Sequence, residues 1–170
     1  MLCIGPKARN LNGTLAYPNG TTANQLEQWQ KWNLLSGLPD LNAASKVPVW
    51  NDPSTGSLND RARAYIDINC AHCHSEDGPA NNSDLYMDYH RELSSSTGIC
   101  KPPVAAGSGS GGRKFAIVPG SPEESILIYR LASLEPEISM PELSRSVVDD
   151  EGLELLKQWI MELDGKCGSD

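Results

Sequence analysis

The feature that most constrains the fold of this chain is a C-x-x-C-H pattern at residues 70–74. Cys70 and Cys73 lie three residues apart, so their thiols face the same side of a helical turn. This spacing is typical of c-type haem attachment, in which two thiols add to the two vinyl groups along one edge of the porphyrin. His74 follows at once and offers its imidazole to the iron. The pattern therefore predicts one covalently held haem c.

Three other interpretations of the pattern stay open. A C-x-x-C pair can supply two of the four ligands of a structural zinc ion, but the remaining candidates are scattered singly at Cys3, His90, Cys100 and Cys167. A redox-active C-x-x-C pair requires a βαβ context, which the sequence does not show. The third alternative is an accidental match.

Length and composition fit one domain completed by a cofactor. The chain has 170 residues, of which 6% are aromatic, with a single Phe. These are few aromatic side chains for the core of a domain of this size, and a buried porphyrin would supply the missing apolar mass. The net charge of −8 argues against a nucleic-acid partner. It suits a soluble carrier whose redox protein partner presents a basic docking patch, although solubility alone explains it equally well.

Three cysteines lie outside the haem pattern, at positions 3, 100 and 167. Bacterial haem attachment takes place outside the cytoplasm, where disulfides persist, so we expect one disulfide among the three, with the pair left open. The sequence has no apolar run of 18 residues, so no membrane span is expected. The first residues lack the features of a signal peptide. We therefore expect a periplasmic or extracellular protein that has lost its leader or is a piece of a longer chain.

The hydrophobic periodicity predicts helices joined by loops and no strand. Residues 1–50 are expected to form a loop-rich N-terminal arm with one helix, from near Thr22 to Gly37. Residues 51–170 are expected to form the haem domain, in which a helix begins after Ser57, its N-cap, and runs into the haem pattern. Further helices are predicted from Ser121, through a capping box, to Pro136, and from Asp149 or Asp150 to Gly165. Stretches rich in Gly and Ser at 94–98 and 107–112 are expected to be flexible loops or to wrap a haem edge.

A six-coordinate haem iron needs a second ligand opposite His74, and the candidates are Met87, Met140, Met161, His72 and His90. His72 lies between the two cysteines and cannot reach the far face, and Met161 sits within the last helix, where a core position is more typical. Met140 is favoured because it lies on a loop between two helices, with Pro141 fixing the backbone after it. A thioether favours ferrous iron and raises the reduction potential.

In its order of elements the chain resembles the class I c-type cytochromes. The resemblance rests on a helix ending in the C-x-x-C-H pattern, Gly78-Pro79 soon after, a Met-Pro pair at 140–141 and a C-terminal amphipathic helix. It implies an all-α, cytochrome c-like helical domain around one haem, in which the helices at 58–70 and 150–163 cross. It also implies that Met140 is the second iron ligand and that the Pro79 carbonyl orients the His74 imidazole.

The phrases at 5–12, 24–26, 62–65, 118–125, 140–143 and 158–160 are similar to those of certain secreted bacterial proteins of unassigned function. They are also similar to modules attached to pyrroloquinoline-quinone sugar dehydrogenases. In that group a further cysteine-containing segment usually precedes the region that matches residues 5–12. The resemblance implies electron transfer and does not imply a substrate.

The function expected from these observations is a monohaem electron carrier rather than an enzyme. No Ser-His-Asp set, Gly-rich phosphate loop or defined carboxylate pair is present in the sequence. One alternative is a peroxidase-like haem enzyme, for which His90 or Glu142 could act as the distal acid–base group. Another is the electron-accepting domain of a larger quinoprotein dehydrogenase.

Overall fold

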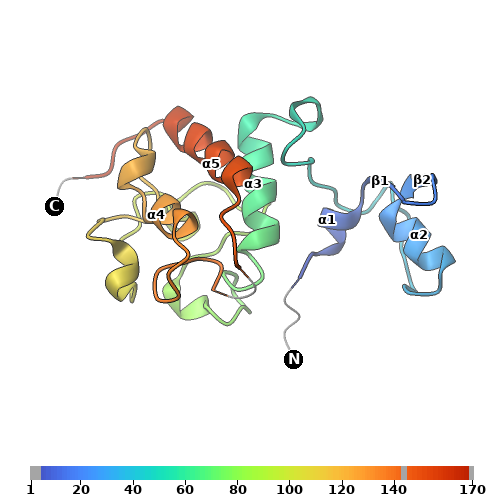
Figure 1. The fold of residues 1–170 in the computed structure, drawn as a ribbon, viewed down its shortest axis with the longest axis horizontal. Coiled ribbons are helices and arrows are strands. Elements are labelled where there is room, and N and C mark those ends of the chain that lie inside the picture. Colours follow the sequence, from blue (N-terminus) through green and yellow to red (C-terminus); the bar gives the residue numbers. More distant parts are fainter. Residues whose placement is uncertain (1–4, 143–144, 169–170) are drawn as a thin grey trace.

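The computed structural model describes residues 5–142 and 145–168 and is mostly helical and rich in loops, with 36% of the chain in helix. Two parts are visible in Figure 1: a compact body, and an N-terminal arm that projects from its side. The described residues form five α-helices and one antiparallel hairpin: α1 (Ala8–Leu11), β1 (Thr14–Ala16), β2 (Thr22–Asn24), α2 (Gln25–Lys31), α3 (Leu58–Asn69), α4 (Ile126–Ala132) and α5 (Asp150–Glu162). None of these helices is long and apolar enough to cross a bilayer.

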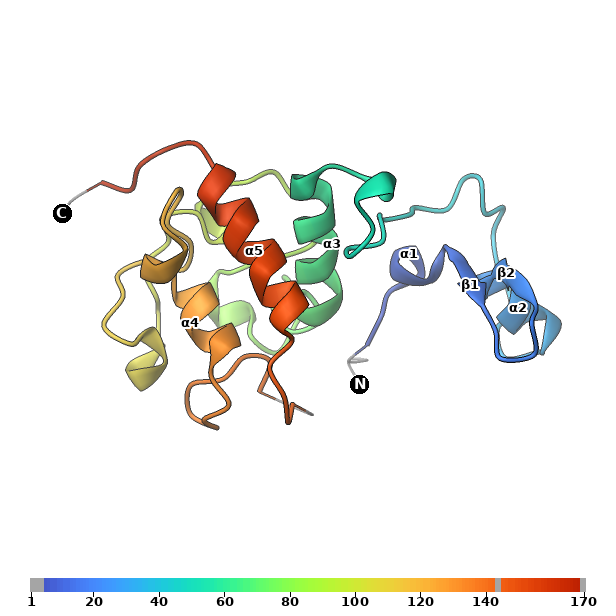
Figure 2. The same ribbon diagram turned by 45° about the horizontal axis from the view of Figure 1, so that its top comes forward.

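The core of the body lies where α3 packs against α5, which run side by side in both views (Figures 1 and 2). Ala62 of α3 and Leu156 and Ile160 of α5 are completely buried in this core. Gly152 lets the two helices approach, because a Cβ atom there would lie 2.3 Å from a ring carbon of Tyr65. The two longest helices thus form the frame on which the C-x-x-C-H segment is mounted.

Both framing helices begin where the sequence predicts. The Ser57 hydroxyl accepts a hydrogen bond from the backbone N–H of Asp60, at 3.1 Å, and so caps α3. The Asp149 carboxylate accepts one from the N–H of Gly152, at 3.1 Å, and so caps α5. The same carboxylate accepts a hydrogen bond from the Tyr65 hydroxyl, which ties the start of α5 to α3.

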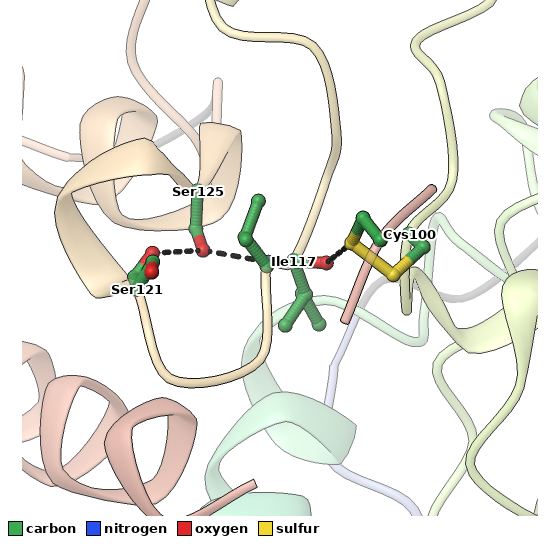
Figure 3. The surroundings of a disulfide bond; sticks show 6 residues. Cys100, Ile117, Ser121 and Ser125 are labelled. Atoms are coloured by element: carbon green, nitrogen blue, oxygen red, sulfur yellow. Dashed lines mark hydrogen bonds between the residues drawn. A yellow bond between two sulfur atoms is a disulfide. The ribbon is translucent and has the colours of Figure 1, made fainter. Parts of the chain in front are cut away.

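The prediction of a helix from Ser121 to Pro136 is wrong at both ends. Residues Pro122–Glu124 form a short 3-10 helix (η5), α4 begins only at Ile126, and the Ser121 side chain caps nothing. The fully buried Ser125 side chain fixes residues 118–125 instead. Its hydroxyl donates to the carbonyl of Ser121 and accepts from the N–H of Val118 (Figure 3). The helix then ends at Ala132, four residues before Pro136.

The arm also differs from its prediction, since it contains a hairpin and two helices. Strands β1 and β2 pair with Leu15 opposite Ala23. Three-residue strands are too short for an alternating pattern, which is why the sequence does not reveal them. Asn24 caps α2 with its side chain, so the helix starts at Gln25 rather than near Thr22, and it ends at Lys31 rather than at Gly37.

A cluster of charges, which we call the arm latch, fastens the arm to α3. The Asp67 carboxylate, 1% exposed, accepts hydrogen bonds from Arg9 at 2.6 and 2.9 Å, from Lys7 at 3.2 Å and from Asn10 at 2.9 Å. Burial alone would raise the pKa of Asp67, but the bonds from Arg9 and Asn10 and the two positive charges outweigh it and lower the pKa to about 2. The latch lies one helical turn before Cys70.

The structure assigns the disulfide that the sequence left open, since Cys100 pairs with Cys167 across 67 residues (Figure 3). This bond closes a loop that contains α4, the Met140 segment and α5. Cys3, the third cysteine outside the haem pattern, lies outside the described residues. The Gly- and Ser-rich stretches contain two short 3-10 helices, η3 (Ser95–Thr97) and η4 (Gly107–Ser110), and η4 packs on α4.

Candidate haem-attachment site

The C-x-x-C-H segment forms a tight turn directly after α3. Cys70 is the C-cap residue, and its N–H donates to the carbonyl of Ile66 at 2.8 Å. Its own carbonyl accepts hydrogen bonds from the N–H groups of Cys73, at 3.1 Å, and His74, at 2.9 Å. Both thiols are free. The turn that follows this helix therefore presents two thiols and one imidazole within five residues.

The electrostatics of the two thiols do not favour a redox-active C-x-x-C pair. Burial, followed by the negative charges of Cys73 and Asp67, raises the pKa of Cys70 to about 12. Burial and the charge of Glu142 raise the pKa of Cys73. Redox-active pairs need accessible thiolates and normally have a lowered pKa. Across residues 5–142 and 145–168, no three His, Cys, Asp or Glu side chains gather as a metal-holding group.

The His74 imidazole is half-buried, and its two nitrogens have different surroundings. The Ser83 hydroxyl lies 3.4 Å from Nδ1. No hydrogen-bond partner for Nε2 occurs in the described part of the chain, so this nitrogen is available to a metal. Burial, with the positive charges of Arg130 and His72, lowers the pKa of His74 against the opposing charge of Glu142. This keeps the ring in its neutral, metal-binding form near pH 7.

Pro79 occupies an exposed position in the loop after the turn. Within the described residues its carbonyl is not a hydrogen-bond partner of His74, and the Ser83 hydroxyl is the partner of Nδ1 instead. Sequence reasoning did not find Ser83, since a serine nine residues after the histidine is not a recognisable signal.

Met140, half-buried, lies on a segment that follows α4 and is held by backbone hydrogen bonds. Its N–H donates to the carbonyl of Arg130 at 3.2 Å, and the Arg145 guanidinium donates to the carbonyl of Met140 at 2.5 Å and to that of Leu131. The charges of Arg130 and Glu142 both act on the pKa of His74. Main-chain hydrogen bonds fix the Met140 segment to the end of α4.

The other proposed iron ligands have different surroundings. Met87 is 5% exposed and packs within the apolar core, although its N–H bonds the carbonyl of His74. Met161 is 59% exposed, so the expectation of a core position for it was wrong; it lies on the outer face of α5. His90 is exposed and bonded to the Ser45 hydroxyl at 2.9 Å. His72 stays beside the thiols, and its buried Nδ1 has no partner in the described residues.

A cavity of about 210 Å³ adjoins the turn. Its lining comes from the last turn of α3, from α4, from the residues after Met140 and from the start of α5, and comprises Tyr65, Asn69, Leu131, Pro141, Arg145, Val147, Asp149 and Leu153. Asn69 immediately precedes Cys70, and Pro141 immediately follows Met140. The lining thus includes a sequence neighbour of Cys70 and one of Met140, but Cys70, Cys73, His74 and Met140 are not themselves among the lining residues.

Arg130 adds a fixed positive charge to this region. Its Nε donates to the carbonyl of Ile138 at 2.8 Å, and its guanidinium packs against Gly109, where a Cβ atom would lie 3.0 Å from the guanidinium carbon. Burial lowers the pKa of Arg130, partly offset by Glu142. No carboxylate of the described residues pairs with it, and a half-buried cation of this kind is well suited to an anionic group.

Within residues 5–142 and 145–168 the side chains fit the group that the sequence predicts: two free thiols, an imidazole whose Nε2 has no partner, a half-buried thioether at Met140 and an arginine that pairs with no carboxylate. No protein-family model matches this chain, and no curated protein or solved structure matches it either. The geometry of the site, rather than a known relative, must therefore carry the functional argument.

Proposed function

We propose that this chain is a monohaem c-type cytochrome that carries single electrons between redox partners outside the cytoplasm. The observation that carries the proposal is the turn after α3, where Cys70 and Cys73 are both free and His74 keeps Nε2 unpaired, while Cys100 and Cys167 are paired with each other. Of the four cysteines that the structure describes, the two left unpaired are those that the attachment pattern needs.

In this proposal each residue has a distinct task. Cys70 and Cys73 would form the thioether bonds, His74 and Met140 would hold the iron, and Arg130 would balance the charge of a haem carboxylate. When bound, the haem supplies a one-electron couple between ferrous and ferric iron. The protein holds the ligands in place and excludes water, which keeps the rearrangement on electron transfer small.

Electron transfer is favoured over catalysis because both axial positions would be filled by protein side chains. Of the two distal acid–base candidates, His90 is exposed and engaged with Ser45. Glu142 is exposed, and its charge acts on His74. A peroxidase-like activity would therefore depend on Glu142 and on displacement of Met140 from the iron.

The location and the partner follow from the same chemistry. The Cys100–Cys167 disulfide is consistent with a compartment outside the cytoplasm, where such bonds persist. Residues 51–170 contain 10 Lys and Arg against 20 Asp and Glu, so the body is far more acidic than the arm. A redox partner with a basic docking patch suits this charge.

A redox titration of the holoprotein, made in cells that attach haem c, tests the proposal. We expect one reversible one-electron transition and negligible peroxide turnover. Rapid peroxide turnover would favour the enzyme alternative, and the Glu142→Gln variant would then be the first test of its acid–base group. A purified chain without covalent haem under these conditions would contradict the proposal.

A further inference from the structure

We propose that Ser83 is the positioning residue that fixes the ring of His74 for iron. The inference rests on the proposed function, because it concerns how this chain presents its iron ligand. The class I resemblance implies that the Pro79 carbonyl orients the His74 imidazole. We assign this task to the Ser83 side chain instead.

The hydrogen bonds around the Ser83 hydroxyl determine which way it can interact. Its single proton is donated to the carbonyl of Ala80, at 2.7 Å. Toward its other neighbours the oxygen can only accept, and it accepts from the N–H of Leu85 at 3.3 Å. Nδ1 of His74 lies 3.4 Å from the same oxygen and must therefore be the donor. A proton on Nδ1 leaves the lone pair of the neutral ring on Nε2, which is the nitrogen without a partner in the described residues.

The backbone explains why Ser83 lies beside His74. After the haem turn the chain doubles back, and the N–H of Ala80 donates to the carbonyl of Cys73 at 3.1 Å. This return is so close that a Cβ atom on Gly78 would lie 2.1 Å from the same carbonyl oxygen, so only glycine fits. A short 3-10 helix, η2 (Asn81–Ser83), then presents the hydroxyl, and Asp84 ends it in a left-handed conformation with φ of 49°.

Two consequences follow for a bound haem. An acceptor on Nδ1–H holds the imidazole in one orientation and makes Nε2 a stronger electron donor. A stronger donor stabilises ferric iron relative to ferrous iron. Loss of the Ser83 hydroxyl should therefore raise the reduction potential and leave the Nδ1 proton less protected from solvent.

The test compares three variants of the holoprotein, each checked for covalent haem. Ser83→Ala removes the hydroxyl, Ser83→Thr keeps one, and Ser94→Ala is a matched control, because the Ser94 hydroxyl bonds Ser96 and not His74. We expect Ser83→Ala to raise the potential and to speed exchange of the His74 Nδ1 proton, followed by NMR in the reduced protein, by about fivefold, the factor for losing one ordinary hydrogen bond. Ser83→Thr and Ser94→Ala should stay close to the wild type.

An unchanged potential and exchange rate in Ser83→Ala would overturn the inference while leaving the cytochrome proposal intact. If Ser83→Ala does not fold, the wild type alone decides: a nuclear Overhauser effect between the Nδ1 proton and the Ser83 β-protons is expected, and its absence would overturn the inference. A wild-type chain that carries no covalent haem would overturn the proposed function and this inference together.

Discussion

The two sides of the candidate haem site are built in different ways. The His74 side is a local structure, in which one helix end, one tight turn and the 78–83 loop place two thiols and the imidazole within fourteen residues of chain. The Met140 side is assembled from distant segments: α4 and Arg145 bond the backbone of Met140, and the Cys100–Cys167 disulfide closes the loop that contains them.

Because of this difference, covalent attachment of the haem and ligation of its iron by Met140 should depend on different parts of the structure. Covalent attachment should need only the His74 side, since both thioether bonds and one iron bond originate there. The second iron bond should depend on the integrity of the Met140 side, which is held by hydrogen bonds to main-chain carbonyls rather than by a deep apolar core. The predictions below test whether the two sides can be disturbed independently.

The largest effect is expected from the double substitution Cys70→Ser with Cys73→Ser. Removing both thiols should abolish covalent haem, which intact-mass measurement and a pyridine haemochrome assay on the denatured chain would report. The control is Cys100→Ser with Cys167→Ser, which removes the disulfide of the Met140 side and should leave haem attached. Equal loss of haem in both double variants would remove the distinction between the two sides.

Met140→Ala should leave the haem attached but open its second axial position. The iron should change from low spin to high spin and bind carbon monoxide readily, since no other thioether lies in this segment. Met161→Ala is the matched control, because Met161 is exposed on α5 and should have no effect on the spectrum. A low-spin spectrum that survives in Met140→Ala would transfer the assignment to Met87 or to another residue.

On the His74 side, the arm latch should make stability depend on acid. The pKa of Asp67 is about 2 in the folded chain and about 3.9 in an unfolded one, so the carboxylate contributes about 2 to 3 kcal/mol above pH 4, and this is lost as the pH falls toward 2. Asp67→Asn should remove this pH dependence and lower the free energy of unfolding at pH 7, as measured by denaturant titration.

Asp88→Asn is the control for the latch, because Asp88 shares Lys7 and Arg9 but its side chain is 28% exposed. It should cost clearly less than Asp67→Asn. If the two variants unfolded at the same denaturant concentration, the burial of Asp67 would not explain how much the latch contributes to the free energy of unfolding.

The smallest effect is expected for Arg145→Gln on the Met140 side. The variant loses donors to the carbonyls of Met140 and Leu131, and we expect a cost of about 1 to 2 kcal/mol in unfolding free energy. Easier displacement of Met140 by added imidazole should accompany it, with haem attachment unchanged. If the variant instead carried less attached haem but had an unaltered affinity for imidazole, Arg145 would support haem attachment rather than iron ligation by Met140.

What the sequence predicted correctly is mostly local. The cap at Ser57 and the start of the last helix near Asp149 or Asp150 are confirmed, because a cap and an apolar stripe are contained within a few turns. The last helix ends at Glu162, however, before the predicted end at Gly165. The mostly helical fold is confirmed for the same reason, whereas the haem itself stays a prediction.

What the sequence could not give depends on contacts between distant segments. Cys100 can pair with Cys167 only because the C-terminal residues return to the loop beside Ile117. No local sequence pattern predicts this return. The start of α4 was predicted wrongly for a similar reason. The buried Ser125 hydroxyl, rather than the Ser121 side chain, makes the hydrogen bonds that fix the chain before this helix. Asp67, Arg130 and Ser83 looked like ordinary polar residues until the fold brought their partners to them.

The most direct measurement is an optical spectrum of the purified holoprotein, oxidised and reduced, combined with a pyridine haemochrome assay. We expect one covalently bound haem c that is low spin in both states, with the red charge-transfer band of methionine on ferric iron. That band should disappear in Met140→Ala. A chain without covalent haem, or one that holds zinc at Cys70 and Cys73, would contradict the central claim.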